Sequence, residues 1–288
     1  LATEKKVSFG QNGEMYVNKD IGVYLWLSTS PDKDAPKHKL NSDSTNVYAN
    51  PMYFDTEGYN TLRSPSAVDP ETKRTIYPLR DIIFEVYADG KAPETKHKYI
   101  GGKSIFRDGI LYYGGQNIGV TLNALDNVSG VEKTYISLNK QKYTPYTDTV
   151  KLTIEGETVL KYYSTDRVGN REEVIDKKVT IDNSAPNTEA ELVGSQNEQF
   201  VSAQTVIKLN SNDSLSGVKT IYYSINGGAK KVYTNPVSVT LSGENGTLSF
   251  YAIDYLNNKE ELKTIGGNSG GSVSTGEGGS FEFYITIY

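Results

Sequence analysis

The sequence predicts an all-β chain made of three tandem β-sandwich domains. Three observations lead to this prediction: the same order of short motifs occurs three times, apolar and polar residues alternate along short runs, and turn-forming residues separate those runs. No amphipathic helix pattern stands out between them. A repeat of about 90 residues is the size of one small domain, whereas the coils of a solenoid repeat every ~20–50 residues.

One repeated motif ends in aspartate and sets the copies apart, at Asp69, Asp166 and Asp254. An Ala-Pro pair closes each of the first two copies, at residues 92–93 and 185–186. Proline cannot donate to a strand ladder and disfavours helix in the residue before it, so these pairs suit junctions between domains. The first copy is the most divergent, and the domains are predicted at 1–92, 93–186 and 187–288.

Alternation is clearest in the second and third copies, for example at residues 120–124 and 207–210. A strand with one buried and one solvated face has this period of two. Short strands with turns every 8–12 residues are typical of an immunoglobulin-like sandwich. The chain has no cysteine, so aliphatic residues and tyrosine must form each core. Residues 266–280 are rich in glycine and predict a loop, either one that contacts a partner or a plain connection between strands.

Composition excludes several classes of function. Without cysteine there is no thiol catalysis, no disulfide and no Cys-ligated zinc. The formal net charge of −5 argues against a nucleic-acid partner. The sequence contains no run of about 20 apolar residues, so it predicts no transmembrane helix. Tandem all-β modules rich in Asn, Ser, Thr and Tyr are typical of extracytoplasmic bacterial proteins.

Four motifs recur in the later copies: Asp-x-x-Ser-Gly-Val at 126–131, a Tyr-x-Ser-x-Asn strand at 135–139, a Tyr-Thr-x-Pro turn at 233–236 and a closing Tyr-Tyr-Ser-x-Asp-x-x-Gly-Asn at 162–170. Together they resemble the bacterial immunoglobulin-like repeats of spirochaetal surface-exposed outer-membrane proteins, which also occur beside bacterial extracellular enzymes. The resemblance covers 118–265 well and 14–92 loosely. It implies a cell-surface or outer-membrane setting and adhesion to host extracellular-matrix or plasma proteins, such as elastin, laminin, fibronectin or fibrinogen.

The recurring aspartates are candidate metal ligands. Asp126 and Asp213 follow the second strand of their copies, and Asp166 and Asp254 end the sixth, so each pair is expected at one pole of its sandwich. The incoming chain is expected to bring Asp89 toward the first pair and Asp182 toward the second, with Asn127 or Asn212 nearby. Clustered carboxylate and amide oxygens are the ligands that Ca²⁺ prefers. The alternative is that each aspartate caps its own turn.

Adjacent tyrosines occur at residues 112–113, 162–163 and 222–223. Neighbouring side chains on a strand point to opposite faces, so one ring of each pair can lie outside the core. Exposed tyrosine is common at binding surfaces, and Tyr112, Tyr163 and Tyr223 are the candidate binding-surface residues. The alternative is that the outer rings only pack across neighbouring strands.

Catalysis has few candidate groups. The two histidines, His38 and His97, lie in different copies and in polar surroundings, and no glycine-rich phosphate loop is present. We therefore expect no enzyme and no cofactor other than Ca²⁺. The expected function is non-covalent binding at the bacterial surface, as an adhesin for extracellular-matrix proteins. A structural spacer or assembly component of the bacterial envelope is one alternative. An accessory sugar-binding region is another, although the only tryptophan, Trp26, is expected in the core.

Overall fold

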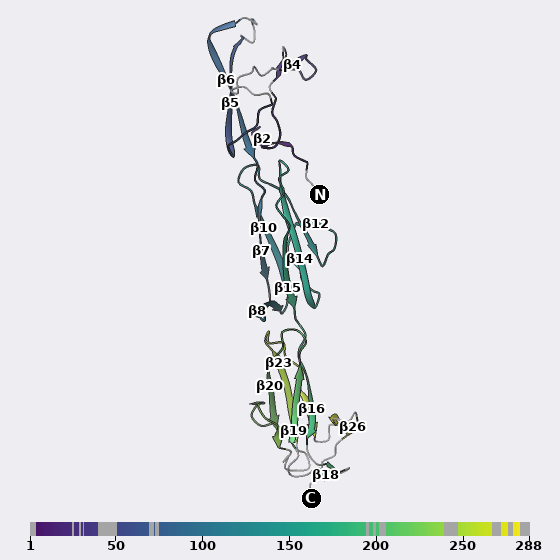
Figure 1. The fold of residues 1–288 in the computed structure, drawn as a ribbon. Coiled ribbons are helices and arrows are strands. Elements are labelled where there is room, and N and C mark those ends of the chain that lie inside the picture. The colour runs from purple at the N-terminus through teal and green to yellow at the C-terminus, as the bar shows by residue number, and fades with distance from the viewer. Residues whose placement is uncertain are drawn as a thin grey trace. The chain divides into compact units, whose positions relative to one another are not determined.

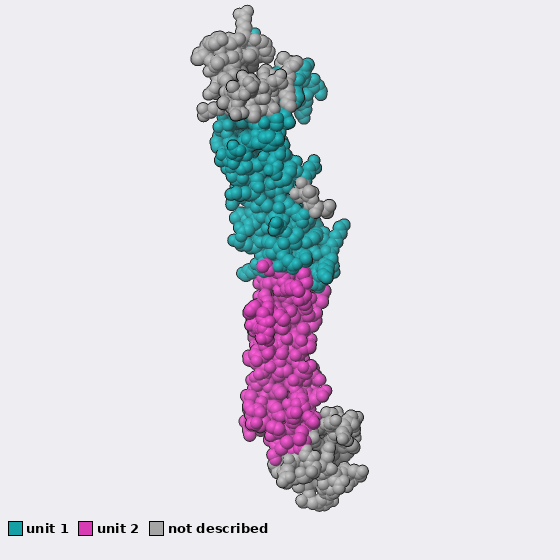
Figure 2. All heavy atoms as spheres, viewed as in Figure 1, with its two compact units in different colours: residues 1–98, 121–149, 160–176 teal, residues 99–120, 150–159, 177–288 magenta. Residues whose placement is uncertain are grey.

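The computed structural model describes residues 4–24, 26–28, 30, 32–39, 51–68, 72, 75–193, 196–197, 200–201, 206–238, 247–266, 272–275 and 279–282. The chain divides into two compact units (Figure 2). Unit 1 consists of residues 1–98, 121–149 and 160–176, and unit 2 of residues 99–120, 150–159 and 177–288. Within the described residues the regular structure is strand (Figure 1), so the predicted all-β, immunoglobulin-like fold class is confirmed.

The first part of the chain forms a four-stranded sheet in the order β1-β2-β6-β5, together with a short β3-β4 hairpin. Its strands are β1 (Val7–Phe9), β2 (Met15–Asn18), β3 (Trp26–Ser28), β4 (Lys37–Lys39), β5 (Gly58–Val68) and β6 (Thr75–Asp89). Val17, Val86 and Ala88 pack with Phe54 in its core. Trp26 does not lie in this core: it is 53% exposed on the hairpin, which corrects the expectation from its alternating context.

The middle part has two sheets, β13-β10-β7 and β12-β11-β14-β15-β9-β8. Its strands are β7 (Glu94–Ile100), β8 (Lys103–Arg107), β9 (Ile110–Gly114), β10 (Gly119–Leu125), β11 (Val131–Leu138), β12 (Thr144–Pro145), β13 (Val150–Lys151), β14 (Gly156–Asp166) and β15 (Ile175–Ile181). The burial of β14 alternates along the strand, as expected where one face is buried and the other is partly solvated.

The last part is a two-layer sandwich. Its strands are β16 (Asn187–Val193), β17 (Gln196–Asn197), β18 (Phe200–Val201), β19 (Val206–Asn212), β20 (Val218–Ile225), β21 (Lys231–Val232), β22 (Val237–Ser238), β23 (Thr247–Asp254), β24 (Lys263–Gly266), β25 (Ser272–Thr275) and β26 (Gly279–Glu282). One sheet runs β22-β19-β16-β25-β26 and the other β21-β20-β23-β24. Ile207 and Leu209 of the first sheet pack with Leu248 and Phe250 of the second in one core.

The segment predicted as a glycine-rich loop, 266–280, is interrupted by a strand. β25 pairs in parallel with β16, where Glu191 is opposite Ser274, and β26 pairs with β25. Residues 272–275 read Ser-Val-Ser-Thr, and β-branched residues favour strand over loop. Residues 283–288, the end of the chain, lie outside the described residues.

Corresponding strands in the two later copies share one irregularity. The pairing of β11 with β14 shifts register between Val131 and Lys133, and that of β20 with β23 shifts between Val218 and Thr220. Both shifts lie beside the aspartate that ends the partner strand, because Val131 pairs with Asp166 and Val218 with Asp254. Such bulges redirect side chains at the end of a ladder, and here they adjoin the acidic residues.

Candidate functional site

The structure brings the recurring aspartates into two clusters of three carboxylates. Cluster 1 consists of Asp89, Asp126 and Asp166 and lies in unit 1, and cluster 2 consists of Asp182, Asp213 and Asp254 and lies in unit 2. In each cluster, one carboxylate oxygen from each residue lies within 4.8 Å of the others. In both clusters two of the three side chains are buried and the third is half-buried.

The half-buried aspartate of each cluster caps the turn that follows it. Asp126 Oδ1 accepts the N–H groups of Val128 at 3.2 Å and Gly130 at 2.7 Å. Asp213 Oδ1 accepts those of Leu215 at 3.1 Å and Gly217 at 2.7 Å in the same way. Turn capping therefore occurs, and it occupies one oxygen of each of these carboxylates. The glycine is needed because the turn ends at a positive φ, 82° at Gly130 and 86° at Gly217.

The aspartate that ends the sixth strand is held by an asparagine four residues later. Asn170 donates its backbone N–H to Asp166 Oδ1 and its side-chain Nδ2 to Asp166 Oδ2, both at 2.7 Å. Asn258 makes the same two contacts, also at 2.7 Å, with Asp254. The motif Asp-x-x-x-Asn is visible in the sequence, but its asparagine was not among the predicted site residues.

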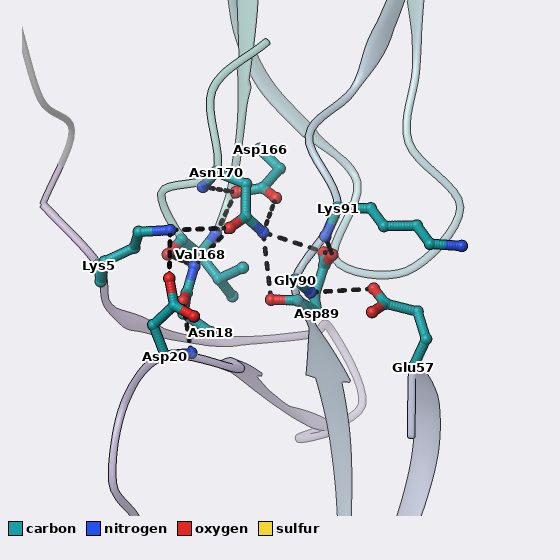
Figure 3. Close-up of polar contacts among 10 residues, drawn as sticks. All are labelled: Lys5, Asn18, Asp20, Glu57, Asp89, Gly90, Lys91, Asp166, Val168 and Asn170. Atoms are coloured by element: carbon teal, nitrogen blue, oxygen red, sulfur yellow. Dashed lines mark hydrogen bonds and ion pairs between the residues drawn. The ribbon is translucent and has the colours of Figure 1, made fainter. Parts of the chain in front are cut away.

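The third aspartate comes from the end of the preceding copy. Asp89 Oδ2 accepts the Ser129 N–H at 3.0 Å, and its backbone carbonyl accepts Asn170 Nδ2 at 3.1 Å. Figure 3 shows Asn170 between Asp89 and Asp166. In cluster 2, Asp182 Oδ2 accepts the Ser216 N–H at 2.9 Å, and its carbonyl accepts Asn258 Nδ2 at 3.0 Å.

The predicted amides, Asn127 and Asn212, are both exposed, and Asn170 and Asn258 occupy the place expected for them. The reason is local. Asn127 lies inside the capped turn, where the backbone N–H groups rather than the side chain face Asp126.

Burial and the charge of a neighbouring carboxylate raise the pKa of three of these aspartates, Asp126, Asp166 and Asp254. Burial raises the pKa of Asp166 to about 6, helped by the negative charge of Asp89 and opposed by the hydrogen bonds from Asn170. The pKa of Asp126 is raised by burial and by the charge of Asp89. The pKa of Asp254 is raised by burial and by the charge of Asp182, against the hydrogen bonds from Asn258. Negative charge is therefore crowded in both clusters.

A glutamate two residues beyond each asparagine was not predicted from the sequence. Glu260 accepts the Thr188 N–H at 2.7 Å and the Ala252 N–H at 3.0 Å, so it joins β16 to β23. Glu172 accepts the N–H groups of Thr95, at 3.0 Å, and Ser164, at 2.6 Å, in the corresponding way. Burial alone would raise the pKa of Glu260, but hydrogen bonds from Lys263 and Thr188 outweigh it and lower that pKa.

The three candidate tyrosines do not form one surface. Tyr112 and Tyr163 are both half-buried, and the Tyr163 ring stacks on Tyr135 with centroids 5.0 Å apart. Tyr223 packs against the core of the last sandwich. On the other side of β20, the half-buried Tyr222 stacks on the buried Tyr251, with ring centroids 5.3 Å apart. The choice of Tyr223 is corrected to Tyr222, because the side of β20 that carries Tyr223 faces the core.

Of the two histidines, His97 hydrogen-bonds through Nδ1 to the hydroxyl of Tyr162 at 2.8 Å. The side chain of His38 lies outside the described residues. Along the described residues, the chain has no helix with the length and apolar character needed to cross a membrane.

No protein-family model matches the chain, and no curated protein matches it. Among solved structures, the chain is similar to one described as "Structures of Clostridium thermocellum CbhA fibronectin(III)-like modules". The identity is 14%, the match covers 59% of this chain and 92% of that chain, and the TM-score is 0.29. A TM-score this low supports no inference about function.

Proposed function

We propose that this protein acts by non-covalent binding, without catalysis, as a surface adhesin for host extracellular-matrix or plasma proteins of the elastin, laminin, fibronectin and fibrinogen class. Its place is extracytoplasmic, at the bacterial cell surface or outer membrane, or secreted. Tandem modules suit such a role because each added contact raises the effective concentration of the next, so that weak contacts sum to a strong attachment.

The observation that carries the proposal is a stack of two tyrosines that recurs at corresponding positions. In one copy Tyr135 lies opposite Tyr163, and in the next Tyr222 lies opposite Tyr251. The two stacks have similar centroid separations, 5.0 and 5.3 Å. Cross-strand aromatic pairs stabilise a sheet, and they also hold rings in place, so that a partner can contact them with little loss of side-chain entropy.

A cation lies over each stack, five residues after the aspartate that ends the strand. The Arg171 guanidinium lies 3.9 Å from the Tyr163 ring centroid, and Lys259 Nζ lies 4.5 Å from that of Tyr251. Such a surface combines aromatic edges with positive charge, and it suits a protein partner that offers acidic and polar groups. The same cations cover ring faces on which a sugar would stack, which disfavours the sugar-binding alternative.

A structural spacer of the envelope is the second candidate. It is favoured by the hydrogen bonds that join the end of one copy to the loops of the next, from Asn170 to Asp89 and from Asn258 to Asp182. A spacer needs stiff junctions and no ligand. Protease treatment of intact cells separates the two functions, since a spacer inside the envelope is protected and a surface adhesin is cleaved.

The proposal is tested by solid-phase binding of the full chain to elastin, laminin, fibronectin and fibrinogen. We expect micromolar or tighter binding to at least one of them. The double variant Tyr135→Ser with Tyr222→Ser should weaken it about tenfold or more. Tyr53→Ser is the matched control, because Tyr53 is 60% exposed and belongs to neither stack. Failure to bind all four proteins at micromolar concentration removes the adhesin function.

A further inference from the structure

We propose that cluster 2 is a calcium site formed by Asp182, Asp213 and Asp254. The inference goes beyond adhesion, since it concerns how successive copies are joined and holds whatever the chain binds.

The first ground is the distance between ligand atoms. One oxygen from each of Asp182, Asp213 and Asp254 lies within 4.8 Å of the other two. Two oxygens that bind the same Ca²⁺ at about 2.4 Å each can be at most ~4.8 Å apart. The spacing therefore fits Ca²⁺ without movement of the strands that carry the three residues.

The second ground is a buried oxygen without a donor. Asp182 is 0% exposed, and its Oδ1 atom has no hydrogen-bond partner. The other oxygen, Oδ2, accepts the Ser216 N–H, which orients the carboxylate toward the loop that begins at Asp213. An ionised buried oxygen without a partner is strongly unfavourable, and a bound cation would satisfy it.

A local difference explains why this oxygen has no donor. In cluster 1, the N–H of Lys91, two residues after Asp89, donates to Asp89 Oδ1 at 3.2 Å. In cluster 2, the N–H of Ser184, two residues after Asp182, donates instead to Glu155 Oε1 at 3.1 Å. The chain thus turns away from Asp182 Oδ1 and leaves it to another partner.

The third ground is charge. Within the described part of the chain, no lysine or arginine forms an ion pair with any of the six clustered carboxylates. Beside cluster 2, Arg107 donates to the Ser216 carbonyl at 2.7 Å and pairs with Asp108, and not with a carboxylate of the cluster. Three aspartates supply enough negative charge for one Ca²⁺, and water can complete its usual six to eight oxygens.

Cluster 1 has the same turn caps, a corresponding asparagine and three carboxylates, but both oxygens of Asp89 accept hydrogen bonds from protein groups, Oδ1 from Lys91 and Oδ2 from Ser129. No oxygen of Asp89 is left without a donor, so cluster 1 serves as the comparison for cluster 2.

Calcium titration of the full chain tests the proposal. Protein freed of metal with a chelator is titrated with CaCl₂ to about 10 mM, above the ~10⁻³ M of weak extracellular sites, and followed by calorimetry. We expect one ion per chain and a melting temperature raised by about 5 °C or more once Ca²⁺ is in large excess over its dissociation constant. MgCl₂ should bind more weakly. No heat and no change in melting temperature would overturn the proposal.

Two variants assign the ion to its cluster. Asp213→Asn removes charge but can still accept the N–H groups of Leu215 and Gly217, so it should abolish calcium binding. Asp126→Asn, the corresponding change in cluster 1, should leave the ion bound. A further control is Asp148→Asn, an exposed residue that accepts the Thr149 N–H at 2.6 Å, and it should also leave the ion bound. A folded Asp213→Asn protein that binds calcium as the unsubstituted chain does would refute the site. Should this variant not fold, the titration of the unsubstituted chain still decides.

Discussion

The two carboxylate clusters share a frame of hydrogen bonds but differ in what surrounds it. In cluster 1, Asn18 Nδ2 donates to Asn170 Oδ1 at 2.7 Å and to the Val168 carbonyl at 3.1 Å. Lys5 Nζ also donates to Asn170 Oδ1, at 3.2 Å, as Figure 3 shows. β2 runs parallel to β6 with Asn18 opposite Asp89. This strand therefore supports the cluster from the side.

In cluster 2 the corresponding position is Gly114, because β9 runs parallel to β15 with Tyr113 opposite Ile181. A Cβ atom on Gly114 would lie 2.4 Å from the Asp182 carbonyl oxygen and 2.9 Å from a methyl carbon of Leu256. No side chain fits there, so no asparagine can support Asn258. The comparison teaches that the turn motif builds the carboxylate frame, whereas a separate hairpin decides how firmly the frame is braced.

The largest expected effect comes from removing the hydrogen bonds that Asn170 makes in cluster 1. Asn170→Ala removes buried hydrogen bonds to Asp89 and Asp166 and takes away one of the two acceptors of Asn18 Nδ2, so it should cost about 2–4 kcal/mol of unfolding free energy. Asn258→Ala, at a half-buried position with fewer partners, should cost about 1–2 kcal/mol. Urea unfolding of both variants measures the difference. Equal losses would mean that Asn18 and Lys5 add nothing.

The next effect concerns the turn between aspartate and asparagine. Gly169 and Asn257 occupy the same place and both have positive φ, 91° and 68°. A Cβ on Gly169 would lie 2.1 Å from the Glu4 carbonyl oxygen, so Gly169→Asn should cost about 1–3 kcal/mol. In the reverse exchange, Asn257→Gly, the new glycine adopts the positive φ without steric cost, so the free energy of unfolding should change by at most ~1 kcal/mol. Thermal unfolding of the two variants tests whether only the turn at Gly169 lies too close to another segment to accept a side chain.

The raised pKa of Asp166 gives a third prediction, for how stability depends on pH in calcium-free buffer. The pKa of Asp166 is raised from 3.8 to about 6, chiefly by burial. Between these values the folded protein binds a proton that the unfolded chain does not, so the contribution of Asp166 to stability is present at low pH and lost as pH rises through about 6. Asp166→Asn should remove this loss.

The measurement is the free energy of unfolding at pH 4, 5, 6 and 7 for the unsubstituted chain and for Asp166→Asn, taken as a difference so that other carboxyls cancel. A difference that does not vary with pH would show that the carboxyl of Asp166 has its ordinary acidity.

The smallest effect is expected from Lys5. Its ammonium lies 3.0 Å from Asp20 Oδ2, the Lys5 side chain is 41% exposed, and exposed ion pairs contribute about 0–1 kcal/mol. Lys5→Ala should therefore destabilise cluster 1 by less than about 1 kcal/mol, and the loss should shrink further in high salt. A larger, salt-independent loss would mean that the hydrogen bond to Asn170, and not the ion pair, is the main contribution.

Much of the frame could be predicted from the sequence because it is local. The alternation of β10 and β19 places Asp126 and Asp213 directly after their strands, and the glycine four residues later allows the capped turn. The convergence of these residues with Asp166 and Asp254 follows from where the strands end. The approach of Asp89 and Asp182 to these two pairs follows from the direction in which the chain passes from one copy to the next.

The outward tyrosines could not be assigned in this way. Tyr162 and Tyr163 lie on β14, whereas Tyr222 and Tyr223 lie on β20, so the two pairs do not correspond although both read Tyr-Tyr-Ser. Tyr135 and Tyr222 are the true counterparts, because each lies opposite a tyrosine of the neighbouring strand in its sheet. Which face of a strand is buried depends on the second sheet, and a two-residue motif carries no information about it.

By itself the sequence determined the all-β class, the recurrence of modules and the acidic turns, since these depend on alternation, propensity and hydrogen bonds within a few residues. Only the tertiary structure decided that Asn170 and Asn258 hold the clusters, that Gly114 leaves cluster 2 without a brace, and that Asp182 Oδ1 is buried without a donor. Those features arise where segments far apart in the chain pack against each other. There, both segments together determine which groups are buried and which acceptor each N–H group bonds to.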